Sequence, residues 1–185
     1  MFLSHKTIEK LIKGGEIVVE PDFDFANIRP VGIRIHLAED ILIPEDGQTV
    51  DLQKPSEPKY RQVSLSKEEF YLEPGQFILG ATHELIKTPA NIVGLLDGRS
   101  TIARIGLTMH VTASIIEGIF GRPHSTVLEI KNLGNFRVRL RAKDPIGMMC
   151  FATLSEAVDQ PIQSQYEVQE KVTPPNLKFK TGVDK

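Results

Sequence analysis

The segment 98–107 carries hydroxyl and guanidinium groups at a spacing that suits the binding of an anion. Ser100 can cap a short helix that ends at Gly106, and the free backbone N–H groups at the start of a helix favour a negative charge. Arg99 and Arg104 place a cation on either side of this turn. The segment could therefore hold a phosphate group. Capped Arg-Ser turns also occur for purely structural reasons, so spacing alone leaves both interpretations open.

A single carboxylate, Glu129, lies within the apolar run 127–130. A glutamate in such a strand either occupies the solvated face or sits in a pocket that shifts its pKa. For an isolated glutamate the solvated position is the more common one. In a pocket, a partly buried carboxylate can take a proton from water and pass it to a leaving group.

The residue types that bind zinc are too few and too scattered to form a site. The chain has one cysteine and five histidines, and no pair of them has the spacing of zinc ligands. Cys150 lies in the apolar run 146–151, which favours a small buried side chain over a nucleophile. His110 and His124 are expected to be structural or surface residues.

The composition is that of a globular protein that binds anions through a few placed charges. Hydrophobic residues make up 41% of the chain and charged residues 25%, which is enough to bury a core. The formal net charge of −2 gives no basic surface for nucleic acid. The N-terminus lacks the apolar core of a signal peptide, and no stretch approaches the ~18 apolar residues that span a bilayer. We therefore expect a cytoplasmic protein with no nucleic-acid or membrane partner.

Short runs rich in Val, Ile, Leu and Phe predict a mostly β protein. A helix is expected at about residues 5–13, with Ser4 as its N-cap, and a second short helix after the Arg-Ser turn. Gly134-Asn135 predicts a tight turn between two strands. The spacing of the runs favours a closed or sandwich-like barrel over a parallel sheet with crossover helices. The expected strands are 17–19, 32–37, 77–82, 92–96, 126–133, 137–140 and 147–154.

Two regions have the composition of irregular structure. Residues 51–69 are polar and contain prolines, which predicts a surface excursion. Residues 156–185 are rich in polar residues and proline, which predicts an extended C-terminal tail that could act as a lid. The remaining residues, 1–155, are expected to form a single β domain.

Three blocks of the sequence together resemble the core of dCTP deaminases, in the family that includes the trimeric dUTPases. They are GRSTIARIGL at 98–107, HVTA at 110–113 and VLEIKN at 127–132, and an apolar strand at 147–154 follows them. The resemblance implies a distorted, jelly-roll-type β-barrel of the dUTPase kind and a homotrimer with active sites between subunits. It also implies a dCTP or dUTP substrate bound with Mg²⁺, which would travel on the triphosphate with few protein ligands.

The resemblance implies a catalytic role for three residues. Glu129 would be the general base and would carry the proton to the leaving group. Ser100 and Arg104 would hold the attacking water and the developing charge, and Arg99, with the amides of the turn, would contact phosphate. Cytosine deamination requires water to add at C4 and a proton to reach the leaving amine, and one poised carboxylate can make both transfers.

Further residues are expected to bind the nucleotide. Thr112 and Ala113 would read the base through backbone groups, and Glu117 stands where the family has an aspartate at the sugar. No residue is expected to ligate a metal, because zinc deaminases need His and Cys ligands that this chain lacks at suitable spacing. The full set implied for nucleotide binding is Arg99, Ser100, Thr101, Ile102, Ala103, Arg104, Thr112, Ala113, Glu117, Val127, Leu128, Tyr166 and Lys178.

The sequence departs from the family pattern at three places. The turn 116–124 is longer and carries Glu117 in place of the aspartate, which moves the carboxylate by roughly an ångström or more. The acidic residue of the family's early strand appears here as Arg34. Family deaminases close over the triphosphate with a C-terminal segment that carries Tyr, Lys and Gln. The tail here offers Tyr166, Gln169, Lys178 and Phe179 in a different arrangement, in which Lys178-Phe179 stands in for a Lys-Tyr pair.

Deamination of dCTP to dUTP and ammonia is the first functional hypothesis, because monofunctional dUTPases usually carry a non-acidic residue at the position of Glu129. A bifunctional deaminase and dUTPase, with Glu117 as the second carboxylate, ranks second, and a simple dUTP diphosphatase ranks third. A nucleotide-binding regulatory trimer of the same fold is the non-enzymatic alternative. The presence of Ser100, Arg104 and Glu129 together argues against it.

Overall fold

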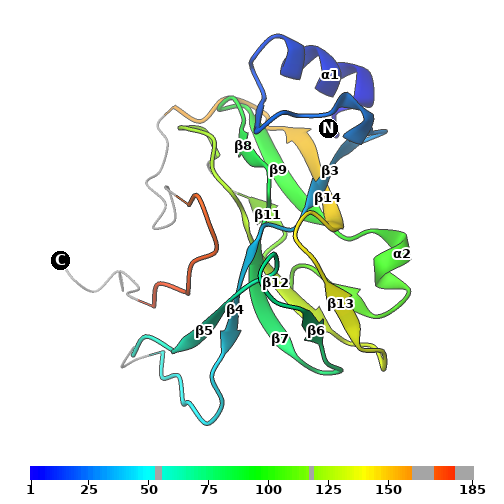
Figure 1. Ribbon diagram of the computed structural model, residues 1–185. Coiled ribbons are helices and arrows are strands. Elements are labelled where there is room, and N and C mark those ends of the chain that lie inside the picture. The colour runs from blue at the N-terminus through cyan, green and yellow to red at the C-terminus, as the bar shows by residue number, and fades with distance from the viewer. Residues whose placement is uncertain (53–55, 117–118, 160–168, 178–185) are drawn as a thin grey trace, which may run out of the picture.

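The computed structural model describes residues 1–52, 56–116, 119–159 and 169–177. In these residues β-strands predominate, with two short α-helices and one 3-10 turn (Figure 1). In chain order the elements are α1 His5–Lys13, β1 Val18–Glu20, η1 Phe25–Asn27, β2 Ile28–Arg29, β3 Gly32–His36, β4 Asp40–Pro44, β5 Tyr60–Ser64, β6 Phe70–Leu72, β7 Phe77–Ala81, β8 Leu85–Lys87, β9 Ile92–Asp97, α2 Ser100–Ala103, β10 Leu107–Thr108, β11 Ile115–Ile116, β12 Val127–Asn132, β13 Val138–Leu140 and β14 Pro145–Thr153.

Most strands belong to two five-stranded antiparallel sheets. The first has the order β10-β12-β7-β4-β5 and the second has the order β11-β9-β14-β3-β2, while β1-β8 and β13-β6 form two ribbons. An isolated bridge between Leu37 and Thr82, just after β3 and β7, joins the two large sheets. The mostly β class and the two short helices are confirmed, and the described strands form separate sheets and not one closed barrel.

The hydrophobic core is built by alternation along the strands of both sheets. On β12, Leu128 and Ile130 are fully buried, whereas Glu129 between them is half-buried on the opposite face. On β3, Ile33 is fully buried and the neighbouring Arg34 is half-buried. Burying one large aliphatic side chain contributes about 1.5–3 kcal/mol, so the aliphatic members of each strand decide which face the charged members take.

A second, smaller apolar cluster lies on the outer face of the first sheet, beside Glu129. Leu79 of β7 is opposite Glu129 in the strand register, and Leu42 of β4 is opposite Leu79. Leu42 and Leu79 are 8% and 7% exposed. Val127 of β12 packs on the same cluster. The carboxylate of Glu129 therefore emerges from an apolar strand surface.

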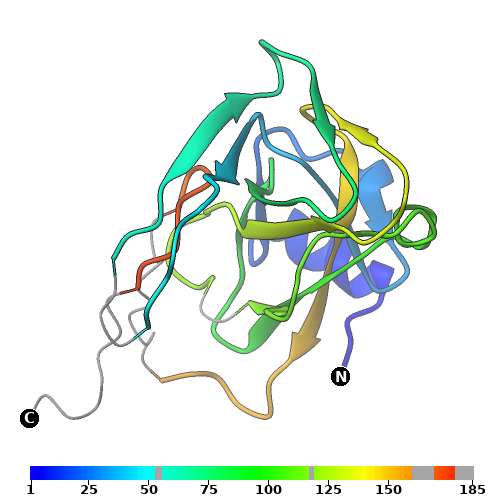
Figure 2. The ribbon, with the colours of Figure 1, turned by 90° about the horizontal axis from the view of Figure 1, so that it is seen from below.

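Part of the predicted C-terminal tail covers this cluster. Val172 is 6% exposed and packs against it. The backbone N–H and the hydroxyl of Ser125 donate to the carbonyl of Gln169 at 2.8 and 3.1 Å. Residues 169–177 therefore lie along the side of the molecule that carries β4 and β5 (orange-red in Figures 1 and 2). The role of the tail as a lid stays a prediction.

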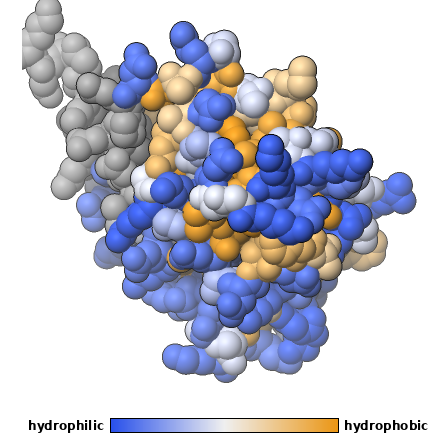
Figure 3. All heavy atoms as spheres, turned by 90° about the horizontal axis from the view of Figure 1, so that it is seen from above, coloured by the Kyte–Doolittle hydropathy of each residue, from blue (hydrophilic) through white to orange (hydrophobic). Residues whose placement is uncertain are grey.

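Helix α1 lies where the sequence predicted it and packs through one face. Ile8 is fully buried, and Leu11 and Ile12 pack against the core. Ser4 adopts the extended backbone of an N-cap, but its hydroxyl makes no capping bond to the helix. The surface at this end of the molecule is largely hydrophilic, with hydrophobic patches between the polar side chains (Figure 3). No helix in the described ranges combines the length and apolar character that crossing a bilayer requires.

The cysteine prediction is confirmed. Cys150 lies on β14 and is 6% exposed. Burial, with a smaller contribution from the negative charge of Asp97, raises the pKa of its thiol. The thiolate, which is the reactive form, is therefore disfavoured at neutral pH.

Two local predictions are wrong. Within the predicted surface excursion 51–69, residues Tyr60–Ser64 form β5, which pairs with β4 and buries Val63. The turn at Gly134-Asn135 does not create a hairpin, because β13 pairs with β6 and not with β12. In both cases a partner distant in sequence supplies the hydrogen bonds, which a local pattern does not report.

Gly106 is the glycine on which the connection from α2 to β10 depends. Its φ is +82°, and a Cβ added there would lie 2.4 Å from the backbone nitrogen of Gly134. We expect Gly106→Ala to lower the free energy of unfolding by about 2–4 kcal/mol, because the left-handed backbone and the steric clash both cost energy. Urea denaturation measures this loss.

The matched control is Gly15→Ala. Gly15 has a similar φ of +74°, but nothing lies within 4 Å of an added Cβ. This variant should lose only about 1–2 kcal/mol, from the backbone conformation alone. Equal losses in the two variants would show that the contact with Gly134 is not tight.

Candidate active site

Glu129 is held by a hydrogen bond that orients its carboxylate. Its Oε2 accepts from the backbone N–H of Val111 at 3.0 Å, and its own N–H donates to the carbonyl of Met109 at 3.1 Å. Both contacts come from the segment that follows β10. One carboxylate oxygen is thus fixed by a backbone donor, while the half-buried side chain stays accessible to a ligand. This placement suits a group that accepts and returns a proton.

The segment next to this carboxylate presents exposed backbone. Thr112 and Ala113, which the sequence assigned to the base, are both exposed. The carbonyl of Thr112 accepts from the N–H of Ser114 at 3.2 Å, and the hydroxyl of Thr108 donates to the carbonyl of His110 at 2.6 Å. The loop is therefore ordered by its own hydrogen bonds. Thr112 and Ala113, the two residues predicted to read the base, directly follow Val111, whose N–H donates to Glu129.

The Arg-Ser turn forms the predicted short helix with a different cap. Arg99 is the N-cap of α2, and its carbonyl accepts from the N–H groups of Ile102 and Ala103 at 2.9 and 2.8 Å. Ser100 is therefore already helical, so its predicted role as the cap is wrong. The helix also ends earlier than predicted, since Arg104 is its C-cap and not Gly106.

The side chains of α2 face outward. Ser100, Thr101, Ala103 and Arg104 are exposed, and Ile102 packs against the core. In Figure 1 this helix projects from one side of the molecule, whereas β12 lies within its body. Within one chain, the predicted catalytic residues therefore fall into two groups. Glu129 belongs to the 109–113 segment, and Ser100 and Arg104 belong to the projecting helix.

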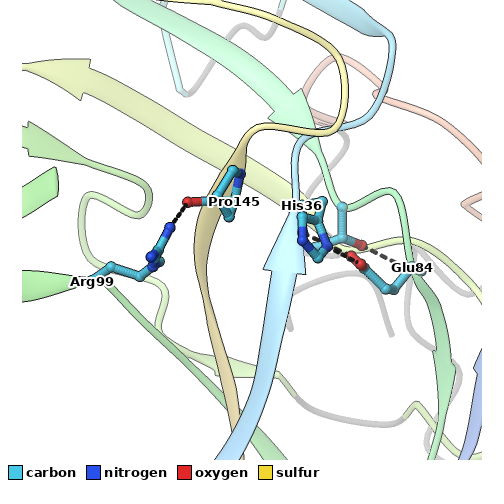
Figure 4. Close-up of polar contacts among 5 residues, drawn as sticks. His36, Glu84, Arg99 and Pro145 are labelled. Atoms are coloured by element: carbon cyan, nitrogen blue, oxygen red, sulfur yellow. Dashed lines mark hydrogen bonds and ion pairs between the residues drawn. The ribbon is translucent and has the colours of Figure 1, made fainter. Parts of the chain in front are cut away.

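Unlike the outward-facing residues of α2, Arg99 directs its side chain toward the second sheet. Its Nη1 donates to the backbone carbonyl of Pro145 at 2.6 Å (Figure 4). Burial, together with the positive charges of Arg34 and Arg29, lowers the pKa of the Arg99 guanidinium. The Arg-Ser turn is thereby fastened to the start of β14, next to other cations.

A pair of hydrogen bonds between Glu84 and His36 secures the same end of β14. Pro145 is opposite His36 in the β14–β3 register. Glu84, only 6% exposed, holds His36 at two points: its Oε1 lies 2.5 Å from the ring Nδ1, and its Oε2 accepts from the backbone N–H at 2.9 Å (Figure 4). Because both carboxylate oxygens are engaged, the end of β3 has one defined position. The carbonyl of Pro145, which accepts a hydrogen bond from Arg99, lies beside this end of β3.

Several predicted nucleotide contacts have other positions or are not described. Val127 is half-buried on the outer face, but the side chain of Leu128 is fully buried in the core, which leaves only its backbone for a ligand. Glu117, Tyr166 and Lys178 lie outside the described residues.

The described residues contain no group of three or more His, Cys, Asp and Glu side chains placed to hold a metal ion. Of the two histidines predicted to be structural, His124 is half-buried, with Nδ1 3.0 Å from the carbonyl of Ser125. His110 is half-buried, and its Nδ1 has no hydrogen-bond partner in the described part of the chain.

Solved structures and known sequences are similar to this chain over most of its length. The 2′-deoxycytidine 5′-triphosphate deaminase of Agrobacterium tumefaciens shares its fold, with a TM-score of 0.62 at 18% identity over 81% of this chain and 47% of that one. The dCTP deaminase of Alteromonas mediterranea is 34% identical over 92% of this chain and 91% of its own length. The dCTP deaminase of Buchnera aphidicola is 33% identical over 96% and 98%.

A family profile described as "dCTP deaminase-like" matches residues 2–154. The chain therefore belongs to the dCTP deaminase-like family. The assignment made from the three sequence blocks is confirmed.

The hydrogen bonds between His36 and Glu84 generate a prediction about stability. We expect Glu84→Ala to lower the free energy of unfolding by about 3 kcal/mol, because it leaves the buried N–H and the imidazole of His36 without their acceptor. The control is Glu73→Ala, which removes a largely exposed partner of Arg137 at 2.8 Å. That variant should lose no more than about 1 kcal/mol. Similar urea midpoints for the two variants would contradict a structural role for Glu84.

Proposed function

We propose that this protein deaminates dCTP to dUTP and ammonia with a water molecule activated by Glu129, without zinc. The proposal is supported by membership of the family and by relatives named dCTP deaminase at about one-third identity. The observation that carries it is the half-buried Glu129 carboxylate, oriented by the N–H of Val111 beside the exposed Thr112 and Ala113.

The reaction requires two proton transfers that a single carboxylate can make. Glu129 takes a proton from water as the water oxygen bonds to C4 of the cytosine ring. The same carboxyl group then gives its proton to the exocyclic nitrogen. The bond from C4 to that nitrogen breaks and ammonia leaves. The proton of the hydroxyl on C4 then passes to ring nitrogen N3, which gives the uracil carbonyl and its N3–H. A group that alternates between base and acid in this way gains from partial burial.

We place the complete site between subunits of a homotrimer. Ser100 and Arg104 are exposed on a projecting helix, whereas Glu129 lies with the 109–113 segment. Helix α2 of one subunit would bring its hydroxyl and guanidinium to the carboxylate of the next. There they would hold the water and the charge that develops at C4.

The remaining parts of the proposal concern the nucleotide and its setting. Arg99 and the exposed start of α2 would hold phosphate, and Mg²⁺ would arrive on the triphosphate with its own waters. Tyr166 and Lys178 of the tail would contact the bound nucleotide. The enzyme would act in the cytoplasm on free nucleotide and not on nucleic acid.

Glu129→Gln tests the assignment of the base. The amide oxygen can still accept from the N–H of Val111, so the fold and dCTP binding should persist, but the amide cannot take a proton. We expect ammonia release from dCTP to fall by at least about a hundredfold, measured with a coupled ammonia assay beside calorimetric binding of dCTP. Deamination at the normal rate by this variant would overturn the mechanism.

The same assay, with pyrophosphate measured in parallel, separates the candidate reactions. Ammonia alone from dCTP supports the deaminase, and ammonia with pyrophosphate supports a bifunctional enzyme. Pyrophosphate from dUTP alone supports a dUTP diphosphatase, and binding without turnover supports a regulatory trimer.

Mixed oligomers test the position of the site. We expect Glu129→Gln and Ser100→Ala each to be inactive alone and to regain activity when they are unfolded, mixed and refolded together. In random trimers, roughly a quarter of the interfaces would join an intact Ser100 to an intact Glu129 of the neighbour. Light scattering checks that the mixture is trimeric. Activity that stays at the level of the separate variants would place both residues in one subunit.

A further inference from the structure

Three arginines lie on the second sheet and on the Arg-Ser turn that is fastened to it. Arg29 ends β2, and Arg34 lies on the adjacent strand β3. Arg34 is opposite Met148, which in turn is opposite Asp97, two residues before Arg99. We call Arg29, Arg34 and Arg99 the arginine cluster. Its members come from three separate strands or turns, so they are brought together by the sheet and not by sequence.

Within the described residues, no carboxylate forms an ion pair with any guanidinium group of the arginine cluster. The bond from Arg99 to the carbonyl of Pro145 is the only side-chain hydrogen bond that the cluster makes in this part of the chain. The nearest carboxylate along the chain, that of Asp97, accepts from the N–H of Gly98 at 2.7 Å and pairs with none of the three arginines. The positive charges of Arg34 and Arg29 act on Arg99, where with burial they lower the pKa of the guanidinium.

The chemistry of the arginine cluster fits a polyphosphate. A guanidinium group binds phosphate through paired N–H donors, and it keeps its charge at any physiological pH. Arg29 is exposed and Arg34 half-buried, so both have donors to offer. The exposed hydroxyls of Ser100 and Thr101 follow directly after Arg99. A chain of phosphates could therefore run from the start of α2 toward the edge formed by β2 and β3.

We infer that the arginine cluster binds the outer phosphates of the nucleotide directly and supplies charge that a divalent cation would otherwise provide. The inference rests on the proposed function, in which Arg99 holds phosphate. It adds Arg29 and Arg34 to the nucleotide-binding residues. It also makes nucleotide binding largely independent of Mg²⁺.

The donor set at this place does not fit a resident divalent cation. Mg²⁺ requires oxygen ligands, above all carboxylates, in an octahedral arrangement. Around Arg99 the strands supply one carboxylate, Asp97, beside Arg29 and Arg34, whose charges would repel a cation. Arg34 stands where the family's early strand carries an acidic residue, so at this position the sign of the charge is reversed.

Titration calorimetry with inorganic tripolyphosphate tests the inference without relying on base chemistry. The native protein should bind tripolyphosphate in EDTA, and adding Mg²⁺ should change the Kd by no more than about threefold. Arg34→Ala should weaken binding in EDTA by about tenfold or more, the loss expected for one charge-assisted contact. Arg61→Ala, at an exposed arginine on the distant edge strand β5, should leave the Kd unchanged.

Arg34→Asp adds a second readout. Restoring a carboxylate should abolish most binding in EDTA and should make the remaining binding depend on Mg²⁺, which a merely structural role would not do. Circular dichroism and urea denaturation check that each variant is folded. Equal affinity of Arg34→Ala and the native protein, or binding by the native protein only with Mg²⁺, would overturn the inference.

Oligomeric state and ammonia release separate phosphate binding at the arginine cluster from subunit contact and from catalysis. If Arg34→Ala changes the oligomeric state and leaves tripolyphosphate affinity intact, the arginine cluster binds carboxylates of a neighbouring subunit, and the inference is wrong. If tripolyphosphate binds as expected but no deamination occurs, the phosphate site stands while the proposed reaction fails. Ammonia release that is insensitive to Arg34 substitution, with unchanged KM for dCTP, leaves the proposed reaction standing and rejects the arginine cluster.

Discussion

The alternation of side chains along β12 is the constraint on which the candidate site depends. Because Leu128 and Ile130 are buried in the core, Glu129 must lie on the opposite face of the strand. There its carboxylate accepts a hydrogen bond from the N–H of Val111. The position of the carboxylate is therefore set by hydrophobic burial, and its orientation by one backbone hydrogen bond. The aliphatic neighbours that make the strand stable are also the reason that a charged group is presented on an apolar surface.

A second constraint operates on the second sheet and sets the position of Arg99. Glu84 holds His36 at the end of β3. His36 is opposite Pro145 in the strand register, and the carbonyl of Pro145 accepts a hydrogen bond from Arg99. The charged groups of the candidate site are thus divided between the two sheets. The carboxylate of Glu129 lies on the first sheet, and Arg99 is held on the second.

Much of the fold and part of the site follow from sequence pattern, for physical reasons that are local. The helix α1 and the strand β12 each require only neighbouring residues, and the sequence predicted both elements. The sequence did not predict strand β5, because its five residues bury only one aliphatic side chain, Val63. The hydrogen bonds of this strand come from β4, which lies elsewhere in the sequence. The contact between His36 and Glu84 joins residues 48 positions apart, and no local pattern marks either partner.

The contact between Arg99 and Pro145 has a consequence for how this site can change during evolution. The acceptor is a main-chain oxygen, so any residue at position 145 that preserves the strand preserves the acceptor as well. Contacts between two side chains can be detected in alignments because the two positions change together. The contact between Arg99 and the backbone of residue 145 would produce no such correlated substitution. Residue 145 can therefore change during evolution while the Arg99 guanidinium keeps its acceptor, because the backbone supplies that acceptor.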